Sequence, residues 1–199
     1  MAQMKTPGVY IIEKNAFPNS VVEVATAIPA FIGHTQFARD GNKDLTGIPF
    51  RISSMAEFHS FFGFAPTLRF GIRPEDSESE DTTNDINVLF PDGSCQLTLP
   101  KTFYALYYNM LLFYANGGGP CYIVSVGDYE HDFKSIDFTN ALLALKKEQE
   151  PTLVVVPEAV YMEEGDCYKV QTAALMHCGN DMKNRFAILD VFNGYQDDN

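Results

Sequence analysis

The second half of the chain alternates short apolar runs with helical patterns, and this alternation restricts the possible fold more than any other feature of the sequence. Runs typical of buried strands cover residues 121–126, 152–156 and 186–191, and helical patterns cover residues 137–148 and 167–178 between them. Strands that alternate with helices of this length are joined by right-handed crossovers, which make the strands parallel and place helices on both faces of the sheet. The sequence therefore predicts an α/β fold with a largely parallel, doubly covered sheet.

Two of the predicted helices can be described in more detail. The helix over residues 137–148 has Asp137 as its N-cap and an apolar face formed by Phe138, Ala141, Leu142 and Leu145. An earlier helix over residues 103–116 has Thr102 as its predicted cap and ends at Gly117. Because this earlier helix is apolar on nearly every side, we expect it to be covered by the sheet and by neighbouring elements or subunits.

The first half of the chain contains fewer regular patterns. Residues 28–33 are typical of a short buried strand that ends at a glycine. Ser54 and Glu57 have the spacing of a capping box, so a short helix is expected up to Gly63, with the phenylalanines Phe58, Phe61 and Phe62 on its buried face. The composition changes over residues 64–100, and the acidic run at 75–85 predicts a surface insertion because it has no apolar side chain to bury. Its acids lack the alternation and the central glycine of a calcium-binding EF-hand loop.

The N-terminal residues 1–26 are predicted to form an extended arm in front of the α/β domain at residues 27–199. The apolar strand in this arm is bounded by prolines, which suits an edge strand or a strand outside the main fold. We expect it to link subunits, and it consists of Thr6, Pro7, Gly8, Val9, Tyr10, Ile11, Ile12 and Glu13.

Charge and hydropathy exclude several classes of function. The formal net charge is -12, and no basic patch is present to bind nucleic acid or an anionic membrane. No apolar run is long enough to span a bilayer, and the first residues lack the apolar core of a secretory leader. The sequence therefore indicates a protein made in the cytoplasm, with no nucleic-acid partner and no direct membrane insertion.

The search for catalytic chemistry gives two carboxylates, Glu158 and Asp190, because ligands of parallel sheets bind at the carboxyl ends of the strands. Neither has a neighbour in the sequence that would complete a magnesium site or an acid–base pair. The glycines at 117–119 follow a helix and precede a strand, whereas a phosphate loop leads into a helix, so they are interpreted as a helix stop. We therefore predict no enzyme activity and no cofactor.

Histidines and cysteines also lack the spacing of a metal or redox site. His177 is adjacent to Cys178 at a predicted helix end, where a favourable contact with the helix dipole is preferred over metal ligation. No two cysteines are spaced as CxxC. Cys121 and Cys167 stand in apolar stretches and are expected to be reduced, small hydrophobic side chains.

Taken in order, the segments resemble those of the contractile tail-sheath family, over most of the chain except the acidic insertion. The two most specific are the TPGVY opening at residues 6–10 and the Asn-Gly-Gly turn that runs into Cys-Tyr-Ile-Val at residues 116–124. The others are residues 27–33, 58–63, 153–157 and 185–190. The order of the segments carries the resemblance, since each alone is typical of an ordinary strand or helix stop.

The resemblance implies a structural subunit that polymerises helically around an inner tube and contracts to drive that tube through a target envelope. It implies further copies of the chain, an inner tube protein, and baseplate and terminal cap proteins as partners, in a virion tail or phage-tail-like particle assembled after synthesis in a bacterial cytoplasm. In such sheaths the N-terminal extension pairs with strands of neighbouring subunits. Family members usually continue with a C-terminal region, so this chain is expected to be a fragment or a short relative.

Two other classes of function stay open at the level of sequence. One is a hydrolase-type enzyme on a doubly wound sheet, for which magnesium-dependent turnover abolished by Asp190→Asn would be evidence. The other is a soluble host-binding module, which would bind a cell-surface partner without assembling.

Overall fold

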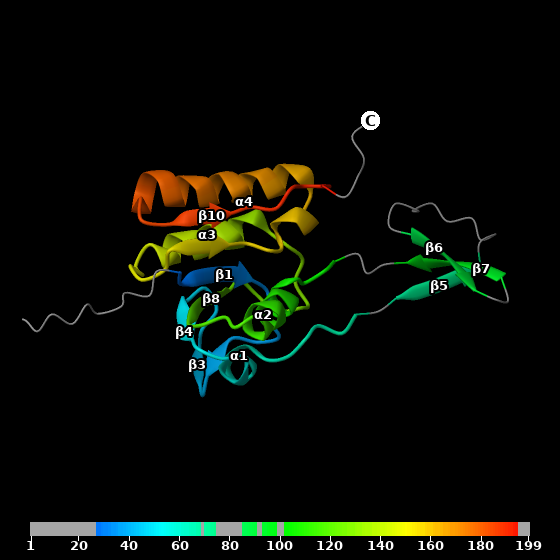
Figure 1. The fold of residues 1–199 in the computed structure, drawn as a ribbon, viewed down its shortest axis with the longest axis horizontal. Coiled ribbons are helices and arrows are strands. Elements are labelled where there is room, and N and C mark those ends of the chain that lie inside the picture. The colour runs from blue at the N-terminus through cyan, green and yellow to red at the C-terminus, as the bar shows by residue number, and fades with distance from the viewer. Residues whose placement is uncertain (1–26, 69, 75–84, 91–92, 99–101, 195–199) are drawn as a thin grey trace, which may run out of the picture.

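A five-stranded sheet forms the centre of the molecule (Figure 1). The computed structural model describes residues 27–68, 70–74, 85–90, 93–98 and 102–194. The sheet has the spatial order β10-β9-β1-β8-β4, in which the first four strands are parallel and β4 pairs antiparallel with β8. Its strands are β1 (Pro29–Gly33), β4 (Phe50–Ile52), β8 (Cys121–Ser125), β9 (Leu153–Val155) and β10 (Phe186–Ile188). The prediction of a largely parallel sheet is confirmed, with one antiparallel edge strand added.

The order of the strands reverses at β1. The chain passes from β1 to β8 on one side of it and then crosses to β9 and β10 on its other side. Open sheets with such a reversal bind ligands beside it, at the carboxyl ends of the strands. The residues that follow β1, β8 and β9 are therefore the first place to look for a site.

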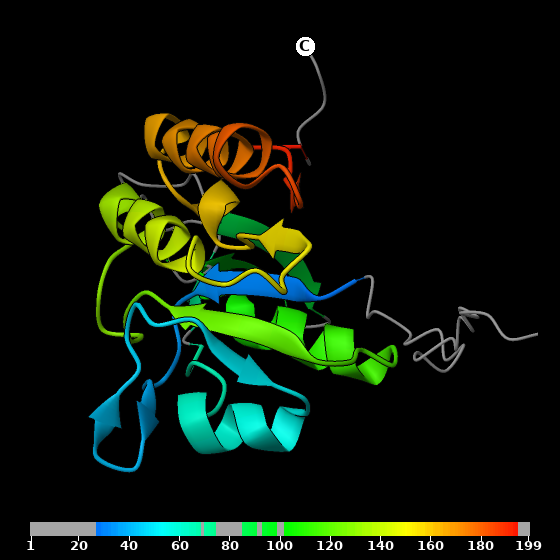
Figure 2. The same cartoon turned by 90° about the vertical axis from the view of Figure 1, so that its left-hand side faces the viewer.

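Helices cover both faces of the sheet (Figure 2). One face packs against α3 (Ser135–Leu145) and α4 (Glu164–Met176), and the other packs against α1 (Met55–Phe62) and α2 (Leu106–Ala115). Successive residues of β1 alternate between the two cores, since Ala30 and Ile32 belong to the first and Phe31 to the second. This alternation explains why all five residues of β1 are buried, as expected for a central parallel strand.

Helix α1 forms as its capping signals predict. The Glu57 backbone N–H donates to Ser54 Oγ at 3.2 Å, and the Glu57 carboxylate accepts from the Ser53 backbone N–H at 2.6 Å. Phe58 and Phe62 lie one turn apart and are fully buried, each stabilising the fold by about 2–3 kcal/mol. The helix ends at Gly63, whose φ of 86° suits a residue without a Cβ.

Helices α2 and α3 begin at residues other than those predicted. Helix α2 starts at Leu106, so Thr102 is not its cap, and the cap residue Ala105 has no side chain that can accept a hydrogen bond. Helix α3 starts at Ser135, two residues before Asp137, which lies in its first turn. The predicted apolar face of α3 is confirmed, with Phe138, Ala141, Leu142 and Leu145 all buried.

The cover on α2 is partial. Leu106 and Met110 are fully buried, but Leu112 is 65% exposed and Leu111 is 40% exposed to solvent in this chain. The prediction allowed other subunits to cover part of α2, so it did not require this chain to cover the helix completely. The turn after α2 confirms the helix stop, because Gly117, which follows the C-cap residue Asn116, has a φ of 81°.

The helical backbone after α4 continues past residue 178, where the predicted helical pattern ends. The α-helix ends at Met176 and is followed by a wide π-helical segment over His177–Met182, after which Lys183 has a φ of 57°. Gly179 therefore does not stop the helix but belongs to the π-helical segment.

Part of the predicted insertion at 64–100 is a small antiparallel sheet, which was not predicted. Its strands are β5 (Gly71–Pro74), β6 (Asp85–Phe90) and β7 (Gly93–Thr98), in the order β5-β7-β6. In the described part of the chain, the remaining elements are a two-stranded ribbon of β2 (Arg39–Asp40) and β3 (Lys43–Asp44) and a 3-10 turn over Ala159–Tyr161. The acidic residues 75–84 and the predicted arm at 1–26 lie outside the described residues.

Candidate functional site

A buried carboxylate–imidazole pair lies where the strand order reverses. His34 follows β1 and Glu158 follows β9, and the His34 Nδ1 atom is 2.8 Å from Glu158 Oε2. The two side chains are 2% and 0% exposed. Glu158 was a candidate from the sequence, but His34 was not, because its partner is 124 residues away along the chain. The signal that would have found it is the position of both residues at the carboxyl ends of strands.

The Glu158 carboxylate accepts three hydrogen bonds. Oε2 accepts from the His34 backbone N–H at 2.9 Å as well as from the imidazole, and Oε1 accepts from the Leu106 backbone N–H at 3.3 Å. Leu106 is the first residue of α2, so Glu158 supplies the acceptor that the cap residue Ala105 lacks. Burial raises the pKa of Glu158, and the hydrogen bonds from His34 and Leu106 oppose that rise.

Gly33 allows these groups to approach each other. A Cβ atom at Gly33 would lie 2.9 Å from the Leu106 Cβ and 3.1 Å from Glu158 Oε1. The last residue of β1 therefore has to be glycine for the carboxylate to reach between β1 and α2. Glu158 thus ties a strand, a helix and a loop together, which is a structural use of the carboxylate.

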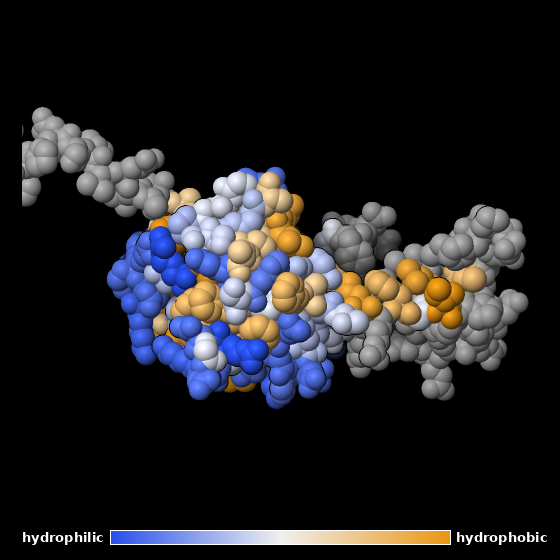
Figure 3. Space-filling model, turned by 90° about the horizontal axis from the view of Figure 1, so that it is seen from below, coloured by the Kyte–Doolittle hydropathy of each residue, from blue (hydrophilic) through white to orange (hydrophobic). Residues whose placement is uncertain are grey.

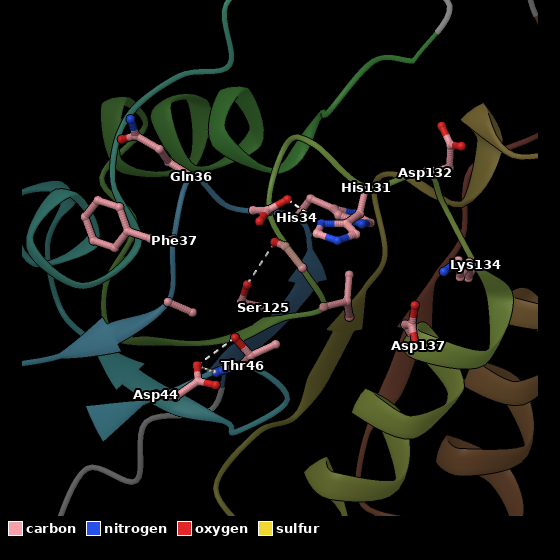
Figure 4. Close-up of a pocket in the computed structure, with 14 residues that line it drawn as sticks. His34, Gln36, Phe37, Asp44, Thr46, Ser125, His131, Asp132, Lys134 and Asp137 are labelled. Atoms are coloured by element: carbon pink, nitrogen blue, oxygen red, sulfur yellow. Dashed lines mark hydrogen bonds and ion pairs between the residues drawn. The ribbon is translucent and has the colours of Figure 1, made fainter. Parts of the chain in front are cut away.

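A pocket of about 470 Å³ opens beside this pair, at the carboxyl ends of β1 and β8. Figure 4 shows His34 in the middle of its lining, with Asp44 and Thr46 on one side and Asp132 and Asp137 on the other. The other lining residues are Gln36, Phe37, Ala38, Ser125, Val126, Gly127, Asp128, His131 and Lys134.

The carboxylates around the pocket are held by short local contacts. Asp44 accepts from the Thr46 backbone and hydroxyl at 2.9 and 2.8 Å, and these hydrogen bonds lower its pKa. Asp128 accepts from the Glu130 backbone N–H at 2.9 Å and from His131, which together lower its pKa. Both groups are therefore negatively charged at neutral pH.

The second carboxylate predicted from the sequence, Asp190, is elsewhere. Asp190 is exposed, its Oδ1 accepts from the Val191 backbone N–H, and its carbonyl accepts from Gln171. Glu158 is buried, and Asp190 shares none of its hydrogen-bond partners, which are His34 and Leu106. Among the described residues, no three His, Cys, Asp or Glu side chains are grouped closely enough to hold a metal ion.

His177 occupies a buried position against Arg185, which corrects the interpretation of a helix-dipole contact. The Arg185 Nη1 atom is 3.3 Å from His177 Nε2. Burial, together with the nearby guanidinium, lowers the pKa of His177 to about 4. The imidazole is therefore uncharged at neutral pH and adds no positive charge to the end of α4.

The expected burial of Cys121 and Cys167 is confirmed, and both thiols are free.

The lowered pKa of His177 predicts an acid-dependent loss of stability. Between pH 6.5 and 4 the unfolded chain binds a proton at this residue that the folded chain does not, so the free energy of unfolding falls as the pH falls through this range. One pKa unit corresponds to about 1.4 kcal/mol, so the shift from 6.5 to about 4 sets an upper limit of about 3.5 kcal/mol. Urea unfolding at several pH values should show a smaller decrease in His177→Leu than in the wild type. Equal decreases in both would contradict the assignment.

Comparisons with protein-family models and with curated proteins identify no relative. No model of a known protein family matches this chain, and no curated protein is significantly similar to it. No helix in the described part of the chain combines the length and the apolar character needed to cross a membrane. The fold and its surfaces are therefore the basis for a functional assignment.

Proposed function

We propose that this chain is a structural subunit of a contractile tail sheath, which assembles with further copies of itself through an N-terminal arm. The observation that carries the proposal most directly is the outer edge of β10. Among the described residues, β10 pairs only with β9, so its other edge offers backbone hydrogen-bonding groups to another chain. Phe186 and Ile188 on this strand are 77% and 52% exposed.

The apolar surface continues beyond this edge. Val191, just after β10, is 72% exposed, and Leu175 and Met176 of α4 are 54% and 55% exposed. Exposed large apolar side chains on an open edge strand and on the helix that contacts it are typical of a surface that another protein covers. A strand added to this edge would receive main-chain hydrogen bonds and apolar contacts together.

A second apolar region lies where the chain leaves the five-stranded domain. Figure 3 shows apolar residues gathered between that domain and the three-stranded sheet, and the exposed large side chains of this stretch are Phe64, Phe70 and Ile72. Two separate apolar regions on one chain suit a heterologous contact, in which different surfaces of two copies meet. Repetition of such a contact generates a helix.

The family resemblance adds the partners and the order of assembly. The opening at residues 6–10 lies outside the described residues, and the other segments that carry the resemblance coincide with β1, α1, the turn from α2 into β8, and the strands β9 and β10. In this proposal the sheath surrounds an inner tube, ends at baseplate and cap proteins, and stores the energy for contraction in its extended lattice. Neither Glu158 nor Asp190 is given a catalytic role.

Removal of residues 1–15 tests the role of the arm. The truncated chain should keep its melting temperature within a few degrees, because we expect few contacts between this segment and its own domain, and it should form no polymers visible by negative-stain electron microscopy. Ile11→Pro should have the same effect as the truncation because proline donates no backbone hydrogen bond, whereas Ile11→Thr is the control that retains the donor. Polymers formed by the truncated chain, or its failure to fold, would contradict the proposed role.

The enzyme alternative makes a different prediction about the same preparations. Turnover by unassembled chains would favour it, particularly if Asp190→Asn removed the activity. A host-binding module would instead bind a cell-surface partner while staying monomeric. One micrograph of native particles distinguishes the sheath from both.

A further inference from the structure

The pocket beside His34 contains a hydrogen-bonding atom that nothing in the described chain uses. His34 Nδ1 is held by Glu158, but no described residue forms a hydrogen bond with Nε2. In the described part of the chain, His177 Nδ1 is the one fully buried side-chain N or O atom without a hydrogen-bond partner. Since His34 Nε2 also has no partner there, it is not fully buried. His34 is only 2% exposed as a residue and lines the pocket, so its Nε2 atom opens on the pocket.

The position of the imidazole is fixed by its surroundings. The rings of Tyr104, Phe133 and Phe138 lie with their centroids 5.0–5.7 Å from that of His34. On the open side, a Cβ atom at Gly127 would lie 3.4 Å from Nε2. Gly127 also lines the pocket, so the absence of a side chain there keeps Nε2 accessible.

The hydrogen bonds of Glu158 define the role of Nδ1. Both carboxylate oxygens accept from backbone N–H groups, so the carboxylate faces donors only, and the imidazole Nδ1–H is the third donor. In the neutral imidazole, an Nδ1 that carries the proton leaves a lone pair on Nε2. In this neutral form His34 presents the pocket with an acceptor, which pairs with a donor from a ligand.

The charge around the pocket selects the kind of donor. Four carboxylates line it, Asp44, Asp128, Asp132 and Asp137, against a single lysine, Lys134. The N-terminus of α3 favours an anion here, but the carboxylates outnumber the positive groups. The volume of about 470 Å³ exceeds that of a bare metal ion, and the described residues hold no group of metal ligands.

We propose that this pocket binds an organic cation, a primary ammonium or a guanidinium group, which donates an N–H to His34 Nε2 while the surrounding aspartates balance its charge. The cation has two possible sources: a free small amine or guanidine, and a lysine or arginine side chain of another protein chain. The proposal rests on the pocket alone and is independent of the sheath assignment.

NMR titration of the full chain tests the proposal with agmatine as the free cation. Saturable binding should move the His34 Nε2 nitrogen resonance in the direction of an accepted hydrogen bond, while the side-chain resonances of His59, which does not line the pocket, stay unmoved. A blocked tripeptide Ala-Arg-Ala is the second probe. Tighter binding of agmatine identifies a free amine as the source, and tighter binding of the tripeptide identifies a protein side chain.

Gly127→Ala is the most specific variant, because its methyl group occupies the space before Nε2 without a change in charge. It should weaken agmatine binding by at least about tenfold, as expected for the loss of a hydrogen bond to a charged group. Gly165→Ala is the matched control, since a Cβ there meets no atom within 4 Å, and it should bind like the wild type. Should Gly127→Ala fail to fold, Asp132→Asn on the exposed loop should weaken binding about threefold, and less at high salt.

Three results would overturn the proposal. They are the absence of saturable binding of either probe, binding that leaves the His34 Nε2 resonance unmoved, and a preference of the pocket for inorganic phosphate over agmatine.

Discussion

Replacement of Glu158 by alanine should destabilise the fold by about 3–5 kcal/mol, the largest effect that we expect from any single substitution. The change removes the acceptor of three donors, the Leu106 backbone N–H, the His34 backbone N–H and the imidazole, in a region closed to solvent. It also leaves a cavity between β1 and α2. A typical domain has a total free energy of unfolding of about 5–15 kcal/mol, so a loss of this size removes a large part of that stability.

Urea unfolding of a graded series measures this effect. Glu158→Gln retains one oxygen acceptor and the shape of the side chain, so it should cost about half as much as Glu158→Ala. Glu130→Ala on the surface is the control and should stay within about 0.5 kcal/mol of the wild type. A double-mutant cycle with His34→Ala should give a coupling energy above about 1 kcal/mol. If Glu158→Ala were as stable as the control, the carboxylate would not hold α2 to β1.

The sheet and its helices could be predicted because each is recorded in a local pattern. The face of α3 repeats at helical spacing, and β1 is a continuous apolar run that ends at a glycine. Helix ends were less predictable where the cap comes from a distant residue. Helix α2 begins at Leu106 because Glu158 accepts from it across 52 residues, and no neighbouring side chain records that contact.

The pocket could be predicted only by its place in the fold. The rule that ligands bind at the carboxyl ends of parallel strands directed attention to Glu158, but nothing in the sequence marks His34 as its partner. The order of the strands brings the two together, and that order depends on which strands pair. The antiparallel sheet of β5, β6 and β7 was missed for another reason, since charged and polar residues surround its strands in the sequence.

The second large effect is expected at Arg185, which is 4% exposed and joins the end of α3 to the start of β10. Its guanidinium donates to the Leu145 carbonyl at 3.4 Å and to the Glu148 carbonyl at 2.7 Å, at the C-terminal end of α3 where helix carbonyls lack partners within the helix. A third donor bonds Asn184 Oδ1 at 3.0 Å. One side chain next to β10 thus satisfies two carbonyls at the end of α3, about 40 residues away in sequence.

Arg185→Met keeps the apolar stem and removes every donor, so it should destabilise the fold by about 2–4 kcal/mol in urea unfolding. Arg185→Lys keeps the charge without the planar fork and should fall between methionine and the wild type. The matched control is Arg51→Met, whose ion pair with Glu150 is exposed and should contribute at most about 1 kcal/mol. Loss of the guanidinium should also raise the pKa of His177, because Arg185 is one of the groups that lower it. Equal losses for Arg185→Met and Arg51→Met would show that the end of α3 is held by other contacts.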